Sequence, residues 1–525
     1  MKRTQRLRLP EWVTAGAAFI YYWVMALYKL TEAPIWQDEA MEFYCSIPVR
    51  GAIRGVTEYA TMYERMAYIQ QQPPLYNWVM CLWLQVSEGE WWYRFSSAVF
   101  GFIAAIGLYA VIRKLCDRCM AAFCVVIYSS IYILMYYIKE ASEYSLLIML
   151  LFWLVYVWLL ICERMDGRRI FLFTLLCVLS VYTHYGAAFV VAPFGISVLV
   201  MAARNRDWRS FRLGLGMDIA AGGIGGFILL YYFVIPQSSN HVSTLFSEKE
   251  IMIEKGNIVY DFLYSLMWVF KWSTIDIDRD WEKIWWLIVA AMIVIACIIV
   301  FVAVKSKRDV FRKYVYCNIA VYLIYYVVTK LNIYAYGWYG NRYNMFLFPL
   351  WFVMIAVSLY EFVMILRQSS NQIIAVNGAK VIQFGLVFAG LLYCLYGDYR
   401  IHCHWAKMDL RTVVAEWYVN EGYEIPTILD FHQRYGFTYY FTHDENYDEA
   451  QWENIVYNDS VEPYDAESGT QVWKDYLNSV YHDQIPDELF LVTGRWNDFV
   501  DTFVELGYKV EPVVDTTAKL YYMKK

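Results

Sequence analysis

Long apolar blocks separated by short polar connections fill roughly the first four hundred residues of the chain. A helix rises 1.5 Å per residue, so about 20 apolar residues cross the ~30 Å hydrocarbon core of a bilayer. The segment 170–183 is short for a span, but Arg168 and Arg169 can snorkel to the interface. The pattern predicts a mostly α-helical, polytopic transmembrane bundle. The eleven expected spans are 12–30, 95–112, 119–138, 144–162, 170–183, 186–203, 213–235, 284–304, 314–330, 343–366 and 381–397.

Two further apolar runs, at 73–84 and 262–272, are too short to cross a membrane. Both are rich in Trp and Tyr, which favour the membrane–water interface. We therefore expect them to be juxtamembrane helices on the outer side. The outer loops are then 31–94, 236–283 and the small 331–342.

Charge separates the chain into two unlike parts and predicts its orientation. Residues 401–525 carry 23 Asp and Glu against 9 Lys and Arg, a net charge of −14, whereas residues 1–400 carry +8. The basic start, MKRTQRLRLPEW, has no small-residue cleavage site, so we expect a retained first helix. With eleven spans, every basic connection lies on the side of the N-terminus, which the positive-inside rule makes cytoplasmic. These connections lie at 113–118, 164–169, 204–212, 305–313 and 367–380.

The composition supports this interpretation. The chain is 59% hydrophobic and 18% charged, which is typical of a membrane protein, and nothing in it indicates nucleic-acid binding. We expect a bacterial-type plasma membrane location, with the acidic C-terminal part outside the cytoplasm.

The last 125 residues have the pattern of a small α/β domain. An amphipathic helix is predicted at 409–422 and a second helix at 497–507, ending at Gly507. The acidic and aromatic stretch 444–468 is expected to be a long loop. The predicted domains are therefore 1–400, a transmembrane catalytic domain, and 401–525, an extracytoplasmic domain. The predicted strands are 425–430, 488–493, 509–514 and 518–523.

Polar candidate residues gather at the predicted outer ends of the helices, and none lies at a bilayer midplane. A proton- or ion-coupled transporter would tend to place ionisable groups in mid-membrane, whereas an enzyme acting on a lipid head group needs them at the interface. The candidates are Asp38, Glu39, Gln72, Tyr76, Arg94, Lys139, Glu140, Tyr144, His184 and Arg342.

These residue types suit the transfer of a sugar from a lipid-linked phosphate. A carboxylate can take the proton of an acceptor hydroxyl or amine, and Asp38 is the candidate base. The departing phosphate needs Arg, Lys or a divalent metal. Glu39 is a candidate to orient the acceptor or, with Asp38, to hold Mg²⁺ or Mn²⁺, although one such pair is a small ligand set. A single displacement with one base inverts the anomeric centre.

The order of several short motifs resembles the GT-C superfamily of membrane glycosyltransferases, over about residues 1–400. It is more closely similar to the bacterial relatives of protein O-mannosyltransferases and of the lipid A aminoarabinose transferase. The motifs are DEA (38–40), QPPLYNW (72–78), WWYRFSSAVFG (91–101), EASEYSLL (140–147), YTHYG (182–186) and NRYNMFLFPL (341–350).

The resemblance implies a polyprenyl-phosphate-linked donor and an active site on the outer face. It makes Asp38 and Glu39 the catalytic signature. Two positions depart from the family pattern: Gln72 stands where relatives commonly have His or Lys, and Ser142 where they commonly have Arg. Lys139 and Arg94 are candidates to replace those contacts. The resemblance also maps family elements onto Pro73, Pro74, Tyr76, Glu140, Ala141, Tyr144 and Arg342.

The predicted function is a glycosyltransferase whose acceptor is a glycolipid, a cell-wall polymer or a protein. The alternative is a transporter or flippase of lipid-linked saccharides, and a third possibility is a polymerase or ligase of lipid-linked oligosaccharides. Each polar candidate also has a structural interpretation, such as snorkelling for Arg342 or packing for Tyr76.

Overall fold

The computed structural model divides the chain into two compact units, each assembled from separate segments. The helical unit comprises Met1–Tyr28, Ala67–Val79 and Trp92–Cys403, and the mixed unit comprises Lys29–Met66, Met80–Trp91 and His404–Lys525. The residues described are 10–238, 281–306, 308–331, 333–334, 341–368, 372–403, 407–430, 433–457, 469–482, 485–494 and 500–525.

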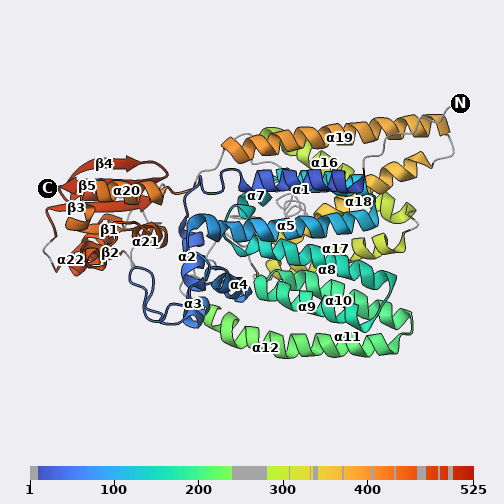
Figure 1. Cartoon of the computed structure of the whole chain (residues 1–525), viewed down its shortest axis with the longest axis horizontal. Helices are drawn as coiled ribbons and strands as arrows, with labels where there is room; N and C mark the ends of the chain where they lie inside the picture. The colour runs from blue at the N-terminus through green and yellow to red at the C-terminus, as the bar shows by residue number, and fades with distance from the viewer. Residues whose placement is uncertain are drawn as a thin grey trace. The chain divides into compact units, whose positions relative to one another are not determined.

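Each of the eleven apolar segments predicted as a span is helical. Figure 1 shows the helices of the helical unit running along a common direction. They are α1 (Glu11–Leu27), α5 (Glu90–Leu115), α6 (Arg118–Ser130) with α7 (Tyr132–Ile138), α8 (Glu143–Glu163), α9 (Gly167–Thr183), α10 (Ala187–Arg204), the continuous run from α11 (Trp208–Ala220) through η1 (Ala221–Gly225), α12 (Gly226–Leu229) and η2 (Leu230–Val234) to α13 (Ile235–Ser238), α16 (Trp281–Lys305), α17 (Asp309–Lys330), η3 (Asn341–Leu347) with α18 (Phe348–Arg367), and α19 (Gln372–Cys403).

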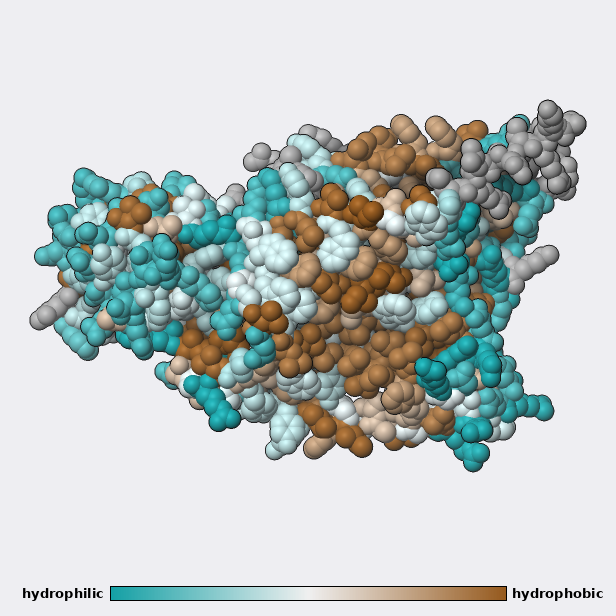
Figure 2. Space-filling model, viewed as in Figure 1, coloured by the Kyte–Doolittle hydropathy of each residue, from teal (hydrophilic) through white to brown (hydrophobic). Residues whose placement is uncertain are grey.

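By length and hydropathy, six helices among the described residues are able to cross a membrane, or seven if the bent pair α6–α7 is one span. The polytopic character is therefore confirmed, while the count of eleven spans stays a prediction. Figure 2 shows a hydrophobic band over the outward face of the helical unit. Large apolar side chains are exposed on several helices of this unit, as expected for a surface that faces lipid. Examples are Ile20, Ile224, Phe227, Phe384 and Leu395.

The bend between α6 and α7 was not predicted. Ile131 has an extended backbone, with φ −75° and ψ 113°, and the two helices meet at 72°. A Cβ built on Gly397 of α19 would lie 1.8 Å from the carbonyl oxygen of Ser130, so only glycine allows α19 to approach the break this closely. After the break, α7 ends at Ile138, and the next residue, Lys139, is one of the candidate residues.

A short helix, α4 (Leu75–Trp83), occupies the first of the two predicted juxtamembrane runs. Its start follows Pro73 and Pro74, and proline is compatible with the first turn of a helix because no intrahelical partner is lost there. The second predicted run, 262–272, lies outside the described residues.

The mixed unit contains a five-stranded sheet of order β2-β1-β3-β5-β4. Strands β2, β1 and β3 are parallel to one another, and β5 is antiparallel to both β3 and β4. The four predicted strands are confirmed, and β2, which lies within the expected loop 444–468, was missed. The strands are β1 (Thr427–Leu429), β2 (Ile455–Tyr457), β3 (Glu488–Gly494), β4 (Lys509–Asp515) and β5 (Ala518–Lys524).

Helices cover both faces of this sheet. Successive strand residues point to opposite faces, so Leu429 packs in one apolar cluster and Ile428 in the other. The predicted helices correspond to α20 (Leu410–Val419) and α23 (Val500–Glu505), while α21 (Arg434–Thr442) and α22 (Gly469–Tyr481) were not predicted. The first outer loop adds α2 (Gln37–Ser46) and α3 (Met62–Tyr68), and short helical turns occur at η4 (Gly422–Glu424) and η5 (Glu449–Asn454).

Candidate active site

The acidic pair lies in the first turn of α2, in the mixed unit. Adjacent residues on a helix point about 100° apart, so the two carboxylates face different surroundings. Asp38 is partly exposed, whereas Glu39 is buried. Both carboxylates are favourably placed near the positive end of the helix dipole.

The buried carboxylate is ion-paired. The Lys407 ammonium lies 2.7 Å from Oε2 of Glu39, and the two side chains are 1% and 0% exposed. The same ammonium lies 5.5 Å from the centre of the Trp36 ring, within range of a cation–π interaction. The pairing joins residues separated by 368 positions, so no local sequence pattern could predict it.

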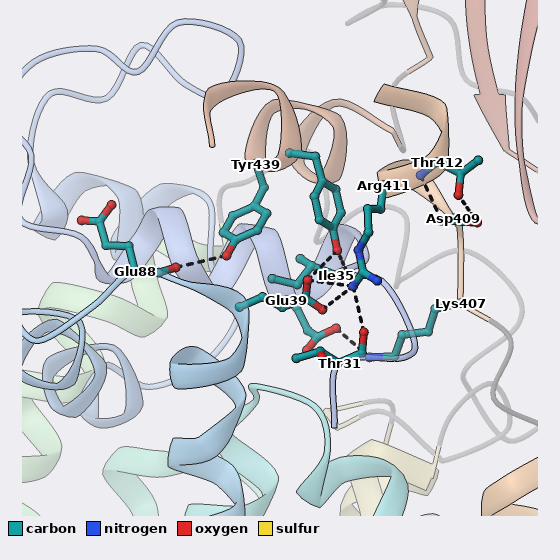
Figure 3. A network of polar contacts seen from close by, with 11 residues as sticks. Thr31, Ile35, Glu39, Glu88, Lys407, Asp409, Arg411, Thr412 and Tyr439 are labelled. Carbon is teal, nitrogen blue, oxygen red and sulfur yellow. Dashed lines mark hydrogen bonds and ion pairs between the residues drawn. The ribbon is translucent and has the colours of Figure 1, made fainter. Parts of the chain in front are cut away.

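A second group of polar contacts surrounds the pair and is drawn in Figure 3. Arg411 donates to both carboxylate oxygens of Glu90, at 2.9 and 2.8 Å, and to the carbonyl of Thr31 at 2.9 Å. Tyr440 donates to Glu90 and accepts the backbone N–H of Ile35 at 2.6 Å. These contacts connect the segment before α2 to the helices α20 and α21. They hold in position the backbone that leads into the acidic pair.

Arg65 is a buried cation that no pattern in the sequence indicated. Its guanidinium donates to the carbonyls of Ile47, at 2.7 Å, Val49 and Tyr59. Burial lowers the pKa of Arg65. It therefore acts as a hub of the first outer loop, satisfying several carbonyls that have no helical or strand partner.

The helical unit has a separate concentration of buried charge. Arg94 in α5, Lys139 at the end of α7, Glu140 beside it and Glu143 at the start of α8 are all buried. The Lys139 ammonium donates to the carbonyl of Tyr28 at 2.6 Å. Two cations and two carboxylates out of water are costly unless each is compensated, so this end of the helices is specialised. Of these four, Glu143 was not among the predicted site residues.

Aromatic and neutral polar side chains extend this cluster. Tyr144 lies 6.0 Å from His184 between ring centres, and His184 lies 6.3 Å from Phe346. Nδ1 of His184 accepts the N–H of Gly186 at 3.1 Å. Burial lowers the pKa of His184 to about 4, so the ring is neutral at pH 7. Because Nδ1 accepts a hydrogen bond, the hydrogen of the neutral ring lies on Nε2.

The segment before α4 is held by its backbone. The carbonyl of Gln72 accepts from Nε2 of Gln237 at 2.8 Å, and Oε1 of Gln237 accepts from Tyr185 at 2.7 Å. Tyr76 is buried in α4. Arg342 lies in η3, and its side chain is outside the described residues.

The candidates therefore divide between the units. Asp38 and Glu39 belong to the mixed unit and the other eight to the helical unit. No group of three or more His, Cys, Asp and Glu side chains in the described part of the chain is arranged to hold a metal ion.

Solved structures of other proteins are similar in fold to this chain. A crystal structure of ArnT from Cupriavidus metallidurans bound to undecaprenyl phosphate is similar over 97% of each chain, with 12% identity and a TM-score of 0.54. The oligosaccharyltransferase of Archaeoglobus fulgidus, in a complex with Zn and sulfate, is similar over 91% of this chain and 67% of its own, with 11% identity and a TM-score of 0.51. At these identities the likeness is one of fold.

Part of the chain also matches a protein family in sequence. The family described as dolichyl-phosphate-mannose-protein mannosyltransferase matches residues 71–222. This range contains every candidate of the helical unit except Arg342. No curated protein matches the chain significantly. The expected resemblance to GT-C membrane glycosyltransferases is thus confirmed for the fold, and the chain is a multi-pass membrane protein.

Proposed function

We propose that this protein transfers a sugar from a polyprenyl-phosphate-linked donor to an extracytoplasmic acceptor, which is a glycolipid, a cell-wall polymer or a protein. The observation that carries the proposal is the buried charge cluster of Arg94, Lys139, Glu140 and Glu143 at one end of the helical unit. Undecaprenyl phosphate, the lipid bound in the ArnT structure, is a ligand of the expected chemistry. Buried charges near the end of a membrane helix are typical of functional sites.

The donor phosphate would bind at this cluster. Arg94 and Lys139 supply positive charge there, and Arg342 is the third candidate. The neutral His184 offers an Nε2–H that can donate to a phosphate or sugar oxygen, and Tyr144 beside it offers a hydroxyl and a flat ring for the sugar. Glu140, Gln72 and Tyr76 are proposed to orient the sugar through its hydroxyl groups.

Asp38 is the proposed general base, because it is the partly exposed member of the acidic pair. The acceptor oxygen or nitrogen attacks the anomeric carbon while its proton passes to the Asp38 carboxylate. The bond between the anomeric carbon and the phosphate oxygen breaks, and polyprenyl phosphate leaves with the electron pair. Attack opposite the leaving group inverts the anomeric centre.

A transfer assay with Asp38→Asn tests the proposal. The purified protein is reconstituted in liposomes with a radiolabelled polyprenyl-phosphate sugar and an acceptor extract, and release of polyprenyl phosphate is measured. Because general base catalysis contributes about 10²–10⁴-fold, we expect Asp38→Asn to lose transfer by about 10³-fold.

The matched control is Glu32→Gln, which removes an exposed acid from the same loop, paired only with Lys29 among the contacts described. It should transfer at the wild-type rate. Equal transfer by Asp38→Asn and wild type would contradict the mechanism. Movement of intact donor across the bilayer without cleavage would favour the flippase alternative.

A further inference from the structure

We propose that Lys407 is the built-in cation of the acidic pair and takes the place that a divalent metal would occupy at Glu39. The placement of the ammonium carries this inference. Its consequence, that Asp38 alone acts on the acceptor, rests on the proposed function. Lys407 lies in the C-terminal part of the chain, outside every motif that resembles the GT-C superfamily.

Because the Glu39 carboxylate is buried and paired, we assign it a positioning role and not a metal-binding one. The Lys407 ammonium is 2.7 Å from Glu39 Oε2, and neither side chain is more than 1% exposed. A Mg²⁺, Mn²⁺ or Ca²⁺ ion bound to this carboxylate would lie about 2.0–2.6 Å from an oxygen. It would therefore lie within a few Å of the ammonium, where two cations repel strongly in a buried site.

Lys407 is also held in place from its backbone. Thr517, in the turn between β4 and β5, donates its hydroxyl to the Lys407 carbonyl at 2.5 Å and accepts the N–H of Asp409 at 3.0 Å. The ammonium further lies over the Trp36 ring. The cation is thus fixed by the sheet of the mixed unit and does not depend on a flexible side chain alone.

Burial makes the pairing hard to replace. Removing one member of a buried ion pair leaves the other charge without compensation, which is strongly destabilising, whereas removing both is often close to neutral. Glu39 is therefore expected to stay paired throughout the reaction. The C-terminal part of the chain then contributes directly to the acidic pair by supplying its cation.

Manganese binding tests the cation claim without reference to activity. Mn²⁺ bound to the full-length protein in detergent is measured by electron paramagnetic resonance for wild type and Glu39→Gln. We expect the two to bind the same amount of Mn²⁺. A wild-type Mn²⁺ site that Glu39→Gln removes would overturn the proposal.

A thermal double-mutant cycle tests the pairing itself. Lys407→Met and Glu39→Gln are each expected to lower the melting temperature by several degrees, and the double variant to recover most of that loss. Additive losses in the double variant would overturn the proposal. Lys29→Met is the control, since that lysine forms an exposed pair with Glu32.

Transfer activity separates the cation role from a purely structural one. We expect wild-type transfer to be unchanged by EDTA, and kcat to fall about 100-fold in Lys407→Met with the donor KM nearly constant. Lys407→Arg, which keeps the charge, should retain most of kcat. Activity that EDTA abolishes and Mn²⁺ restores would overturn the proposal. If wild type transfers no sugar at all, the proposed function fails, while the Mn²⁺ and thermal comparisons still decide the cation claim.

Discussion

Charged side chains are exposed at one end of the helical unit and buried at the other. At the end where α1 begins and α5 finishes, the ion pairs lie on the surface: Glu11 binds Arg113 at 2.6 Å, and Lys114 binds Glu163 at 2.7 Å. At the other end of the helical unit, a group of four charged side chains is buried. These are Arg94, Lys139, Glu140 and Glu143.

Contacts along α1 and α5 show which residues lie at which end. Glu11, in the first turn of α1, contacts Arg113 in the last turn of α5. Near its other end, α1 packs Trp23 against Phe95, beside Arg94, with 5.9 Å between ring centres. The Lys139 ammonium binds the carbonyl that follows α1. The 26 residues of α5 place about 39 Å between the ends.

The difference in burial suggests different roles for the charges at the two ends: orientation in the membrane at one end and chemistry at the other. Exposed ion pairs contribute about 0–1 kcal/mol, and surface charge at this end agrees with the predicted cytoplasmic side. Buried charges are expensive and persist where they have a use. The comparison therefore supports the proposal that the donor binds at the end that contains Arg94 and Lys139.

The largest effect is expected from Lys139→Met at the buried end. Loss of this cation should reduce kcat/KM for the lipid-linked donor by about 100-fold, because charge-assisted hydrogen bonds to phosphate are strong. Steady-state transfer at varied donor concentration measures it. Lys114→Met, at the opposite end, is the matched control and should change kcat/KM less than about 2-fold. Equal losses in both variants would remove the functional distinction between the ends.

His184 should make stability fall in acid. Its pKa is about 4 when buried, below the 6.5 of the exposed group, so the unfolded chain binds the proton more tightly. The neutral ring therefore favours folding fully above pH 6.5, and the benefit is lost as pH falls from 6.5 to 4. We expect about 2 kcal/mol less stability from this group at pH 5 than at pH 7. In His184→Asn, the melting temperature should depend less on pH across this interval, and an unchanged slope would contradict the burial of the ring.

An intermediate case is the pair between Arg308 and Glu361, at the end with surface charges. Oε1 of Glu361 lies 3.1 Å from Nη1 of Arg308, and the carboxylate side chain is 10% exposed against 47% for the guanidinium. Because the guanidinium is well solvated, Arg308→Met should destabilise the protein by only about 1 kcal/mol. Transfer activity should not change, and a loss of activity larger than that of Lys139→Met would reverse the comparison.

The smallest effect is expected from Glu11→Gln. Both partners of its pair with Arg113 are more than a third exposed. The free energy of unfolding should change by less than about 0.5 kcal/mol, so the melting temperature should shift little. Transfer should be unaffected. A clear loss of either would show that this end carries more than surface pairs.

Helix placement in the membrane part could be predicted because length and apolar content decide it. All eleven segments are helical, and the predicted strands of the C-terminal sheet are present. The sharp bend at Ile131 could not be predicted, since it depends on the approach of Gly397 from a distant helix. The missed strand β2 has only three residues and is defined by pairing with β1, not by a pattern of its own.

The candidate site was predictable as a set of residues but not as an arrangement. Polar side chains at the helix ends stand out in an apolar sequence, so Arg94, Lys139 and Glu140 could be named. Their burial, and the pairing of Glu39 with Lys407, depend on contacts between segments far apart in the chain. Arg65 gave no signal because a single arginine in a polar loop is ordinary.

The position of a bound lipid phosphate tests the central claim most directly. The protein with undecaprenyl phosphate in a nanodisc, examined by electron cryomicroscopy, gives the location of the phosphorus. We predict that a phosphate oxygen lies about 2.7–2.9 Å from a nitrogen of Arg94 or Lys139, as charge-assisted hydrogen bonds require. A phosphate bound instead beside Arg113 and Lys114, at the opposite end of α5, would contradict the account.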